Sequence, residues 1–159
     1  PFRHFYEKFL PGLDLEECQE VFGKNHSRNP RIYAGIKEIL RFLHHKKIEV
    51  GILSGHPQEF LDAEIRYHGL GEFFDPRYVY GGVHDKIEVA EDVLQNNGFK
   101  KDNTAYIGDL IHDLKTGRSL GVFTVASLYG WTPADKLREQ DADMYISHPL
   151  ELHRLITKS

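Results

Sequence analysis

The chain has 159 residues, of which 40% are hydrophobic and 28% are charged, a composition typical of a single globular domain rather than a disordered segment. The formal net charge of −4 gives no electrostatic reason to expect a nucleic-acid partner. No apolar run approaches the roughly 20 residues that a spanning helix needs, and no signal peptide is recognisable, so we expect no membrane partner. The single cysteine, Cys18, excludes an intrachain disulfide and fits a reducing compartment, which predicts a cytoplasmic protein.

The first 30 residues predict a small helical segment. Apolar side chains recur at helical spacing through residues 2–10, and Pro11-Gly12 ends that pattern. Asp14 is a candidate N-cap of a second helix, and residues 23–30 are typical of a linker.

From residue 31 onward, strand and helix patterns alternate along the chain. Apolar residues at helical spacing predict helices near residues 33–45, 57–68, 86–96, 112–120, 133–139 and 149–157. Short apolar runs between them predict strands near residues 48–53, 78–80, 104–107, 122–126 and 143–146. This alternation is the pattern of an α/β fold with a parallel sheet flanked by helices. In such sheets, ligands bind beyond the carboxyl ends of the strands.

The first polar cluster at a strand end is Ser54-Gly55-His56, directly after the apolar run 48–53. The Ser54 hydroxyl and the N–H groups of Gly55 and His56 are suited to bind a phosphate oxygen, because the dipole of the following helix favours an anion at its start. A second interpretation is open, in which Ser54 only caps that helix.

Lys86 is the second candidate, at the predicted N-terminus of the helix 86–96. A lysine is locally unfavourable there because the helix dipole prefers an anion, and a bound phosphate would compensate for this. The alternatives are an ordinary surface lysine and an N-cap formed by the neighbouring Asp85.

The third candidate is the pair Asp109 and Asp113 in the stretch AYIGDLIHDLKTG, residues 105–117. Carboxylate oxygens are the ligands that Mg²⁺ prefers. Asp113 follows Asp109 by one helical turn, so it is suited either to bind the same metal or to orient its waters. A helix cap formed by either aspartate is the alternative.

The order and spacing of these three motifs resemble the haloacid dehalogenase-like hydrolase superfamily, and most closely its phosphoglycolate phosphatase branch. In that family a Ser or Thr ends the second motif, a Lys forms the third and GD-x-x-x-D forms the fourth. The matching segments here are LSG at 53–55, Lys86 and GDLIHD at 108–113. The similarity extends to IYAGIKEILRFL and ADMYISHPLEL, and it covers residues from about 31 to 157.

The resemblance implies a Rossmann-like core over residues 31–159, with residues 1–30 as the remnant of a helical cap. It implies a Mg²⁺-dependent phosphatase for a small phosphorylated metabolite. In that reading Ser54, Gly55 and His56 bind the phosphoryl group and Lys86 neutralises its charge. Asp109, supported by Asp113, would hold Mg²⁺.

The family's first motif is a strand that ends in D-x-D and supplies the nucleophilic aspartate, and we find no counterpart for it. Asp141-Ala142-Asp143 precedes a predicted strand instead of ending one, and Leu13-Asp14-Leu15 follows Pro-Gly rather than a strand. The strand of that motif lies in the middle of the family's sheet, so its absence would leave the neighbouring strands without a pairing partner.

Three explanations are open, and we favour the first. The sequence is part of a longer protein, it is a short protein that exchanges the strand between the subunits of a homo-oligomer, or it is a non-catalytic phosphate- or partner-binding module. A phosphomutase is a further alternative to the phosphatase. Without the nucleophile, we expect this chain to be inactive alone.

Overall fold

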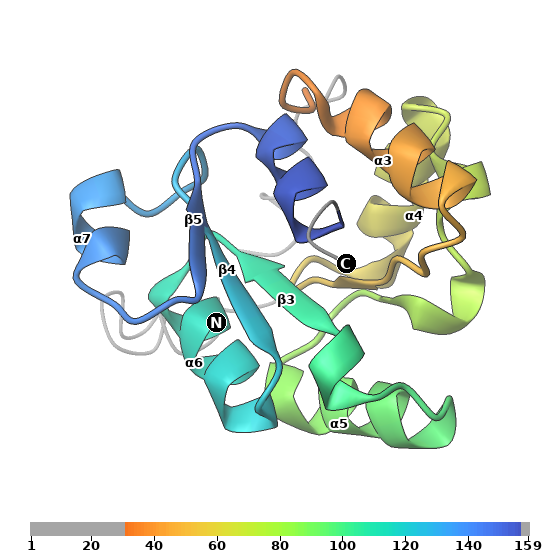
Figure 1. Ribbon diagram of the computed structural model, residues 1–159. Coiled ribbons are helices and arrows are strands. Elements are labelled where there is room, and N and C mark those ends of the chain that lie inside the picture. The colour runs from red at the N-terminus through yellow and green to blue at the C-terminus, as the bar shows by residue number, and fades with distance from the viewer. Residues whose placement is uncertain (1–30, 157–159) are drawn as a thin grey trace, which may run out of the picture.

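The computed structural model describes residues 31–156, and Figure 1 gives their path. The helical cap remnant that we expected at residues 1–30 lies outside the described residues. Within residues 31–156, no helix is both long and apolar enough to cross a membrane.

The α-helices lie close to the ranges that the sequence predicts. They are α3 (Ile36–His45), α4 (Gln58–Tyr67), α5 (Lys86–Asn96), α6 (Ile111–Leu120) and α7 (Ala134–Arg138). Gly121 follows α6 with a φ of 68°, a left-handed conformation that only glycine adopts readily. The described residues also form the short 3₁₀ segments η1 (Gly71–Phe73), η2 (Pro76–Tyr78), η3 (Lys101–Asn103) and η4 (Pro149–Leu155).

Two sequence predictions about these elements need correction. The run 48–53 forms only the two-residue strand β1 (Ile52–Leu53), because its partner β2 (Val79–Tyr80) is also only two residues long and directly follows η2. The last predicted α-helix is instead the 3₁₀ segment η4, which begins at Pro149.

The strands form two parallel sheets within the described part of the chain. One contains β1 and β2, and the other has the order β3 (Ala105–Gly108), β4 (Phe123–Ser127) and β5 (Met144–Ile146). The α/β fold with parallel strands and flanking helices is therefore confirmed. Among these residues β1 pairs only with β2 and β3 pairs only with β4, so β1 and β3 each have one unpaired edge. Ser54 directly follows β1, and Asp109 directly follows β3.

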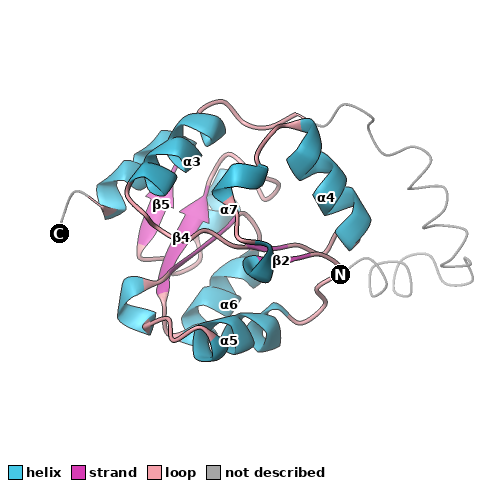
Figure 2. Cartoon of the chain, turned by 90° about the vertical axis from the view of Figure 1, so that its right-hand side faces the viewer, coloured by secondary structure: helices cyan, strands magenta, loops and turns pink. Residues whose placement is uncertain are grey.

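Helices cover both faces of the three-stranded sheet, as Figures 1 and 2 show. Successive side chains of a strand point to opposite faces. On one face of β4, Val125 packs with Ile39 of α3 and Leu152 of η4, and on the other face Ala126 packs with residues of α6 and α7. The core therefore lies on both sides of β4, whose residues 124–127 are buried.

Candidate active site

A buried ion pair links the second and third candidate motifs. The Lys86 ammonium lies 2.6 Å from Oδ1 of Asp113, and the two side chains are 13% and 5% exposed. The interpretation of Lys86 as a surface lysine is therefore wrong. Asp85 is the N-cap of α5, since its Oδ1 accepts hydrogen bonds from the N–H groups of Ile87 and Glu88. The predicted cap is therefore confirmed, and it does not exclude a phosphate role for Lys86.

Asp113 uses both of its carboxylate oxygens inside the protein. While Oδ1 pairs with Lys86, Oδ2 accepts a hydrogen bond of 3.1 Å from the Leu110 N–H at the start of α6. Burial raises the pKa of the Tyr106 phenol, and the negative charge of Asp113 acts in the same direction. Asp113 thus caps its helix and holds Lys86 in place.

Asp109 is placed differently, in the turn between β3 and α6. It is half-buried, and its Oδ2 accepts a hydrogen bond of 2.6 Å from the Trp131 N–H in the loop after β4. Its Oδ1 accepts none from residues 31–156. Leu110 rather than Asp109 is the N-cap residue of α6, so one oxygen of Asp109 is open to a ligand.

Ser54 follows β1 and does not cap α4, which begins at Gln58 with Pro57 as its N-cap residue. Its hydroxyl oxygen accepts a hydrogen bond of 3.1 Å from the His56 N–H, so that amide is already used in this turn. The Gly55 N–H donates to no other described residue. The Ser54 hydroxyl keeps its own hydrogen for a ligand, because a hydroxyl both donates and accepts.

Hydrogen bonds connect the candidate residues across the molecule. The Ser54 carbonyl accepts from the Val83 N–H at 2.9 Å, three residues before Lys86, and Lys86 in turn bonds Asp113. The structure thus joins Lys86 directly to Asp113 and ties Ser54 to the Lys86 segment through the backbone. No hydrogen bond joins Ser54 to Asp109 in the described part of the chain.

The loop after β4 packs directly on Asp109, and no sequence motif predicted this contact. The Thr132 N–H donates to the Asp109 carbonyl at 3.3 Å, and a Cβ at Gly130 would overlap the Asp109 side chain. Burial raises the pKa of Tyr129 in this loop, a hydrogen bond with Ser127 lowers it and the charge of Asp109 raises it. The only sequence signal was Gly130 between two aromatic residues, in the run YGW.

Comparison with known proteins identifies the family of the chain. Residues 2–127 match the family of haloacid dehalogenase-like hydrolases. The chain belongs to this family.

Two curated relatives and one solved structure illustrate the similarity. Pyrophosphatase PpaX of Halalkalibacterium halodurans is 28% identical over 82% of this chain and 66% of its own length. A phosphoglycolate phosphatase of Pseudomonas syringae pv. tomato is 27% identical over 91% of this chain and 52% of its own length. The crystal structure of a predicted phosphatase from Clostridium acetobutylicum superposes with a TM-score of 0.83 at 19% identity, over 100% of this chain and 78% of that one, which shows a common fold. The chain thus spans between about half and two thirds of these curated relatives.

The candidate metal ligands are of the type that Mg²⁺ prefers, but there are too few of them within residues 31–156 to form a complete site. Carboxylate oxygens are the right ligands, and Oδ1 of Asp109 is the one that no described residue uses. Among residues 31–156, however, no three His, Cys, Asp or Glu side chains gather closely enough to hold an ion. Water and at least one further ligand from outside these residues would have to complete the site.

The D-x-D sequence at Asp141-Ala142-Asp143, which we rejected as the family's first motif, makes structural contacts. Asp143 precedes β5, and its Oδ2 accepts a hydrogen bond of 2.7 Å from the Thr124 N–H. Asp141 is 96% exposed and pairs with Arg118.

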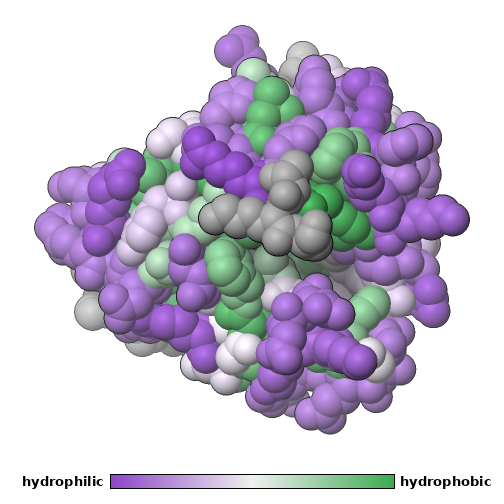
Figure 3. Space-filling view, in the orientation of Figure 1, coloured by the Kyte–Doolittle hydropathy of each residue, from purple (hydrophilic) through white to green (hydrophobic). Residues whose placement is uncertain are grey.

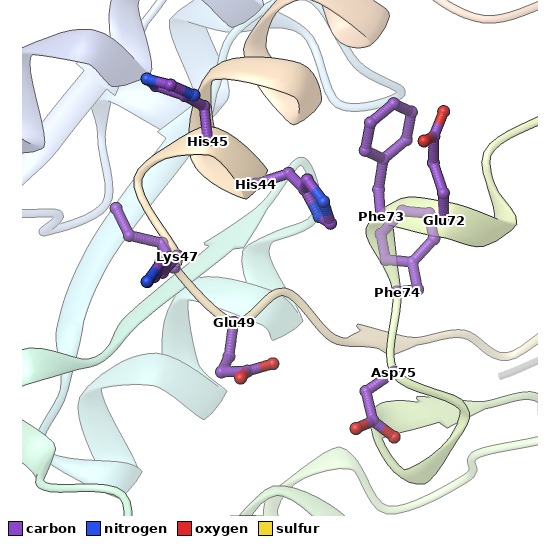
Figure 4. A pocket seen from close by; sticks show the side chains of 9 residues that line it. His44, His45, Lys47, Glu49, Glu72, Phe73, Phe74 and Asp75 are labelled. Carbon is purple, nitrogen blue, oxygen red and sulfur yellow. The ribbon is translucent and has the colours of Figure 1, made fainter.

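A pocket of about 460 Å³ lies elsewhere, at the end of α3. It is lined by residues of the last turn of α3, of the segment before β1 and of the 72–75 segment, whose side chains Figure 4 shows. Ile48 and Glu49 in its wall precede β1, whereas Ser54 follows β1. None of Ser54, Lys86, Asp109 and Asp113 lines this pocket, so it is separate from the candidate active site.

Proposed function

We propose that this chain forms part of a Mg²⁺-dependent phosphoric monoester hydrolase that acts on a small phosphorylated metabolite. The observation that carries the proposal is Lys86, a nearly buried ammonium at the N-terminus of α5 that is held by Asp113. An ammonium has three N–H donors, and the Asp113 bond uses one of them. The relatives named as a pyrophosphatase and a phosphoglycolate phosphatase support phosphate chemistry. The single cysteine supports a cytoplasmic location.

Each candidate residue has a distinct role in this proposal. The Ser54 hydroxyl and the Gly55 N–H bind the oxygens of the transferring phosphoryl group beside His56, and Lys86 neutralises its negative charge. Asp109 provides the open oxygen for the metal, and Asp113 supports the site by holding Lys86. Mg²⁺, when bound, stabilises charge on the phosphoryl oxygens.

The nucleophilic aspartate would come from an additional strand between β1 and β3. The open edges of β1 and β3 support this, since within residues 31–156 neither has a partner there. Ile107 of β3 is 42% exposed, although residues 124–127 of the neighbouring strand β4 are buried. The space-filling view shows the face of the molecule that is turned to the viewer in Figure 1. Hydrophobic side chains gather near its middle, and its periphery is mostly hydrophilic (Figure 3). Another segment of a longer protein, or a strand exchanged within a homo-oligomer, would fill this position.

The test separates binding from turnover. We expect the purified 159-residue chain to bind orthophosphate in the presence of MgCl₂ in calorimetry, and to hydrolyse p-nitrophenyl phosphate no faster than a buffer blank. Ser54→Ala should weaken orthophosphate binding because it removes a donor. Ser119→Ala, on the exposed side of α6, is the matched control and should bind normally.

The outcomes are distinct. Mg²⁺-dependent turnover by this chain alone would show that the nucleophile is already present. Absence of orthophosphate binding would refute the proposed phosphate site. A monomer in light scattering would contradict strand exchange between subunits while leaving the phosphate site intact.

A non-catalytic phosphate- or partner-binding module is the second candidate, because among the described strands only β3 is directly followed by a carboxylate, that of Asp109. A peptide with an apolar strand that ends in Asp-x-Asp distinguishes the two functions. Turnover that appears when this peptide is added supports the hydrolase, and phosphate binding without turnover supports the module.

A further inference from the structure

The position of Trp131 is fixed relative to Asp109 by backbone contacts. Its N–H donates to Oδ2 of Asp109 at 2.6 Å, and the next residue, Thr132, donates to the Asp109 carbonyl at 3.3 Å. Gly130 packs so closely on Asp109 that a side chain there would overlap it. The backbone of Trp131 is therefore held directly beside the candidate metal residue.

The loop is anchored at its other end by Tyr129. This half-buried ring packs against the core around Val125 and meets the Tyr33 ring edge to face, with 5.0 Å between the centroids. Such aromatic pairs prefer this geometry and stabilise the elements that they join. The backbone of Trp131 is therefore held on both sides.

The Trp131 side chain is nevertheless 87% exposed, the largest exposed fraction among the large hydrophobic residues in the described part of the chain. An indole offers a flat apolar face and a single N–H donor, and burying such a ring is among the most favourable contacts that a side chain can make with a ligand. A ring that is left in water, on a fixed backbone beside the candidate metal residue, is poorly explained by folding alone.

We propose that Trp131 is a specificity-determining residue, whose indole face contacts the organic group of a phosphate ester bound at Ser54, Lys86 and Asp109. The favoured organic group has a flat apolar face, as an aromatic ring or one face of a sugar ring has. This inference rests on the proposed function and adds the class of substrate to it.

The experiment compares three probes with the 159-residue chain in MgCl₂: orthophosphate, phenyl phosphate and glucose 6-phosphate. Trp131 is the only tryptophan in the sequence, so its emission reports directly on contact. We expect at least one of the two esters, phenyl phosphate or glucose 6-phosphate, to change the fluorescence emission of Trp131. Trp131→Ala should lower the affinity for that ester by about fivefold, the size of an aromatic contact, and should change the affinity for orthophosphate by less than about twofold.

Two further variants define the role. Trp131→Phe keeps an aromatic face and should retain most of the preference for the ester over orthophosphate. Phe123→Ala removes another exposed aromatic ring, at the amino end of β4, and should change the affinity for none of the probes.

Three results would overturn the inference. The first is an ester affinity that is unchanged in Trp131→Ala. The second is an equal loss for orthophosphate and both esters, which would mean that Trp131 only positions Asp109. The third is failure of the unaltered chain to bind orthophosphate at all, which would refute the proposed phosphate site and this inference with it.

Discussion

Asp109 and Asp113 belong to one short motif, yet the structure gives them opposite environments. Asp113 is 3% exposed, and both of its oxygens are bonded to the protein, one of them to a buried ammonium. Asp109 is half-buried, and only one of its oxygens is bonded, to a backbone N–H. One carboxylate is thus committed to holding the site together, while the other offers an oxygen to a ligand. Substitution of Asp113 should therefore mainly lower the free energy of unfolding, whereas substitution of Asp109 should mainly lower the affinity for a metal.

Asp113→Ala should have the largest effect on stability. It leaves the Lys86 charge nearly buried without its partner and removes the hydrogen bond from the Leu110 N–H. Breaking a buried pair by removing one partner typically costs about 3–5 kcal/mol. We expect a decrease of that size in the free energy of unfolding, measured by urea denaturation followed by circular dichroism.

Two control variants sharpen this result. Asp141→Ala breaks the ion pair between Arg118 and a 96% exposed aspartate, and should change stability little, since exposed pairs contribute little. The double variant Lys86→Met/Asp113→Leu removes both charges, so it should be more stable than Asp113→Ala alone. A double variant that is as unstable as the single one would mean that the ion pair is not the source of the loss.

Gly108→Ala should have the next largest effect, because a Cβ at Gly108 would overlap the Asp113 side chain. Overpacking of this kind typically costs about 1–3 kcal/mol. The free energy of unfolding should therefore fall, again in urea denaturation. Gly71→Ala is the matched control, since a Cβ at Gly71 meets no heavy atom within 4 Å, and its stability should stay close to that of the unaltered chain.

Local patterns in the sequence were sufficient for most of the fold. The helix that ends at Gly121 and the strands 104–107 and 122–126 follow from periodicity and from the conformational freedom of glycine, which are properties of neighbouring residues. Strand length was less predictable. Residues 48–51 belong to the predicted strand 48–53 but form none, because strand formation also depends on a partner far away in the sequence.

The candidate site was predictable as a set of motifs but not as a set of contacts. Lys86 and Asp113 are 27 residues apart, and nothing local to either one indicates that they pair. The metal role of Asp109 and Asp113 stays a prediction, and the motif gave no sign that Asp113 also pairs with Lys86. Trp131 was missed because its link to Asp109 uses a backbone N–H, which every residue except proline has.

Asp109→Asn should have the smallest effect on stability and a large effect on metal binding. The asparagine carbonyl can still accept the hydrogen bond from the Trp131 N–H, and no buried cation loses its partner. We therefore expect urea denaturation to give nearly the same free energy of unfolding as the unaltered chain. Because Mg²⁺ prefers charged carboxylate oxygens, its affinity in calorimetry should fall strongly. Unchanged Mg²⁺ affinity would show that Asp109 is not a metal ligand. A loss of stability comparable to that of Asp113→Ala would show that Asp109 stabilises the fold as much as Asp113 does.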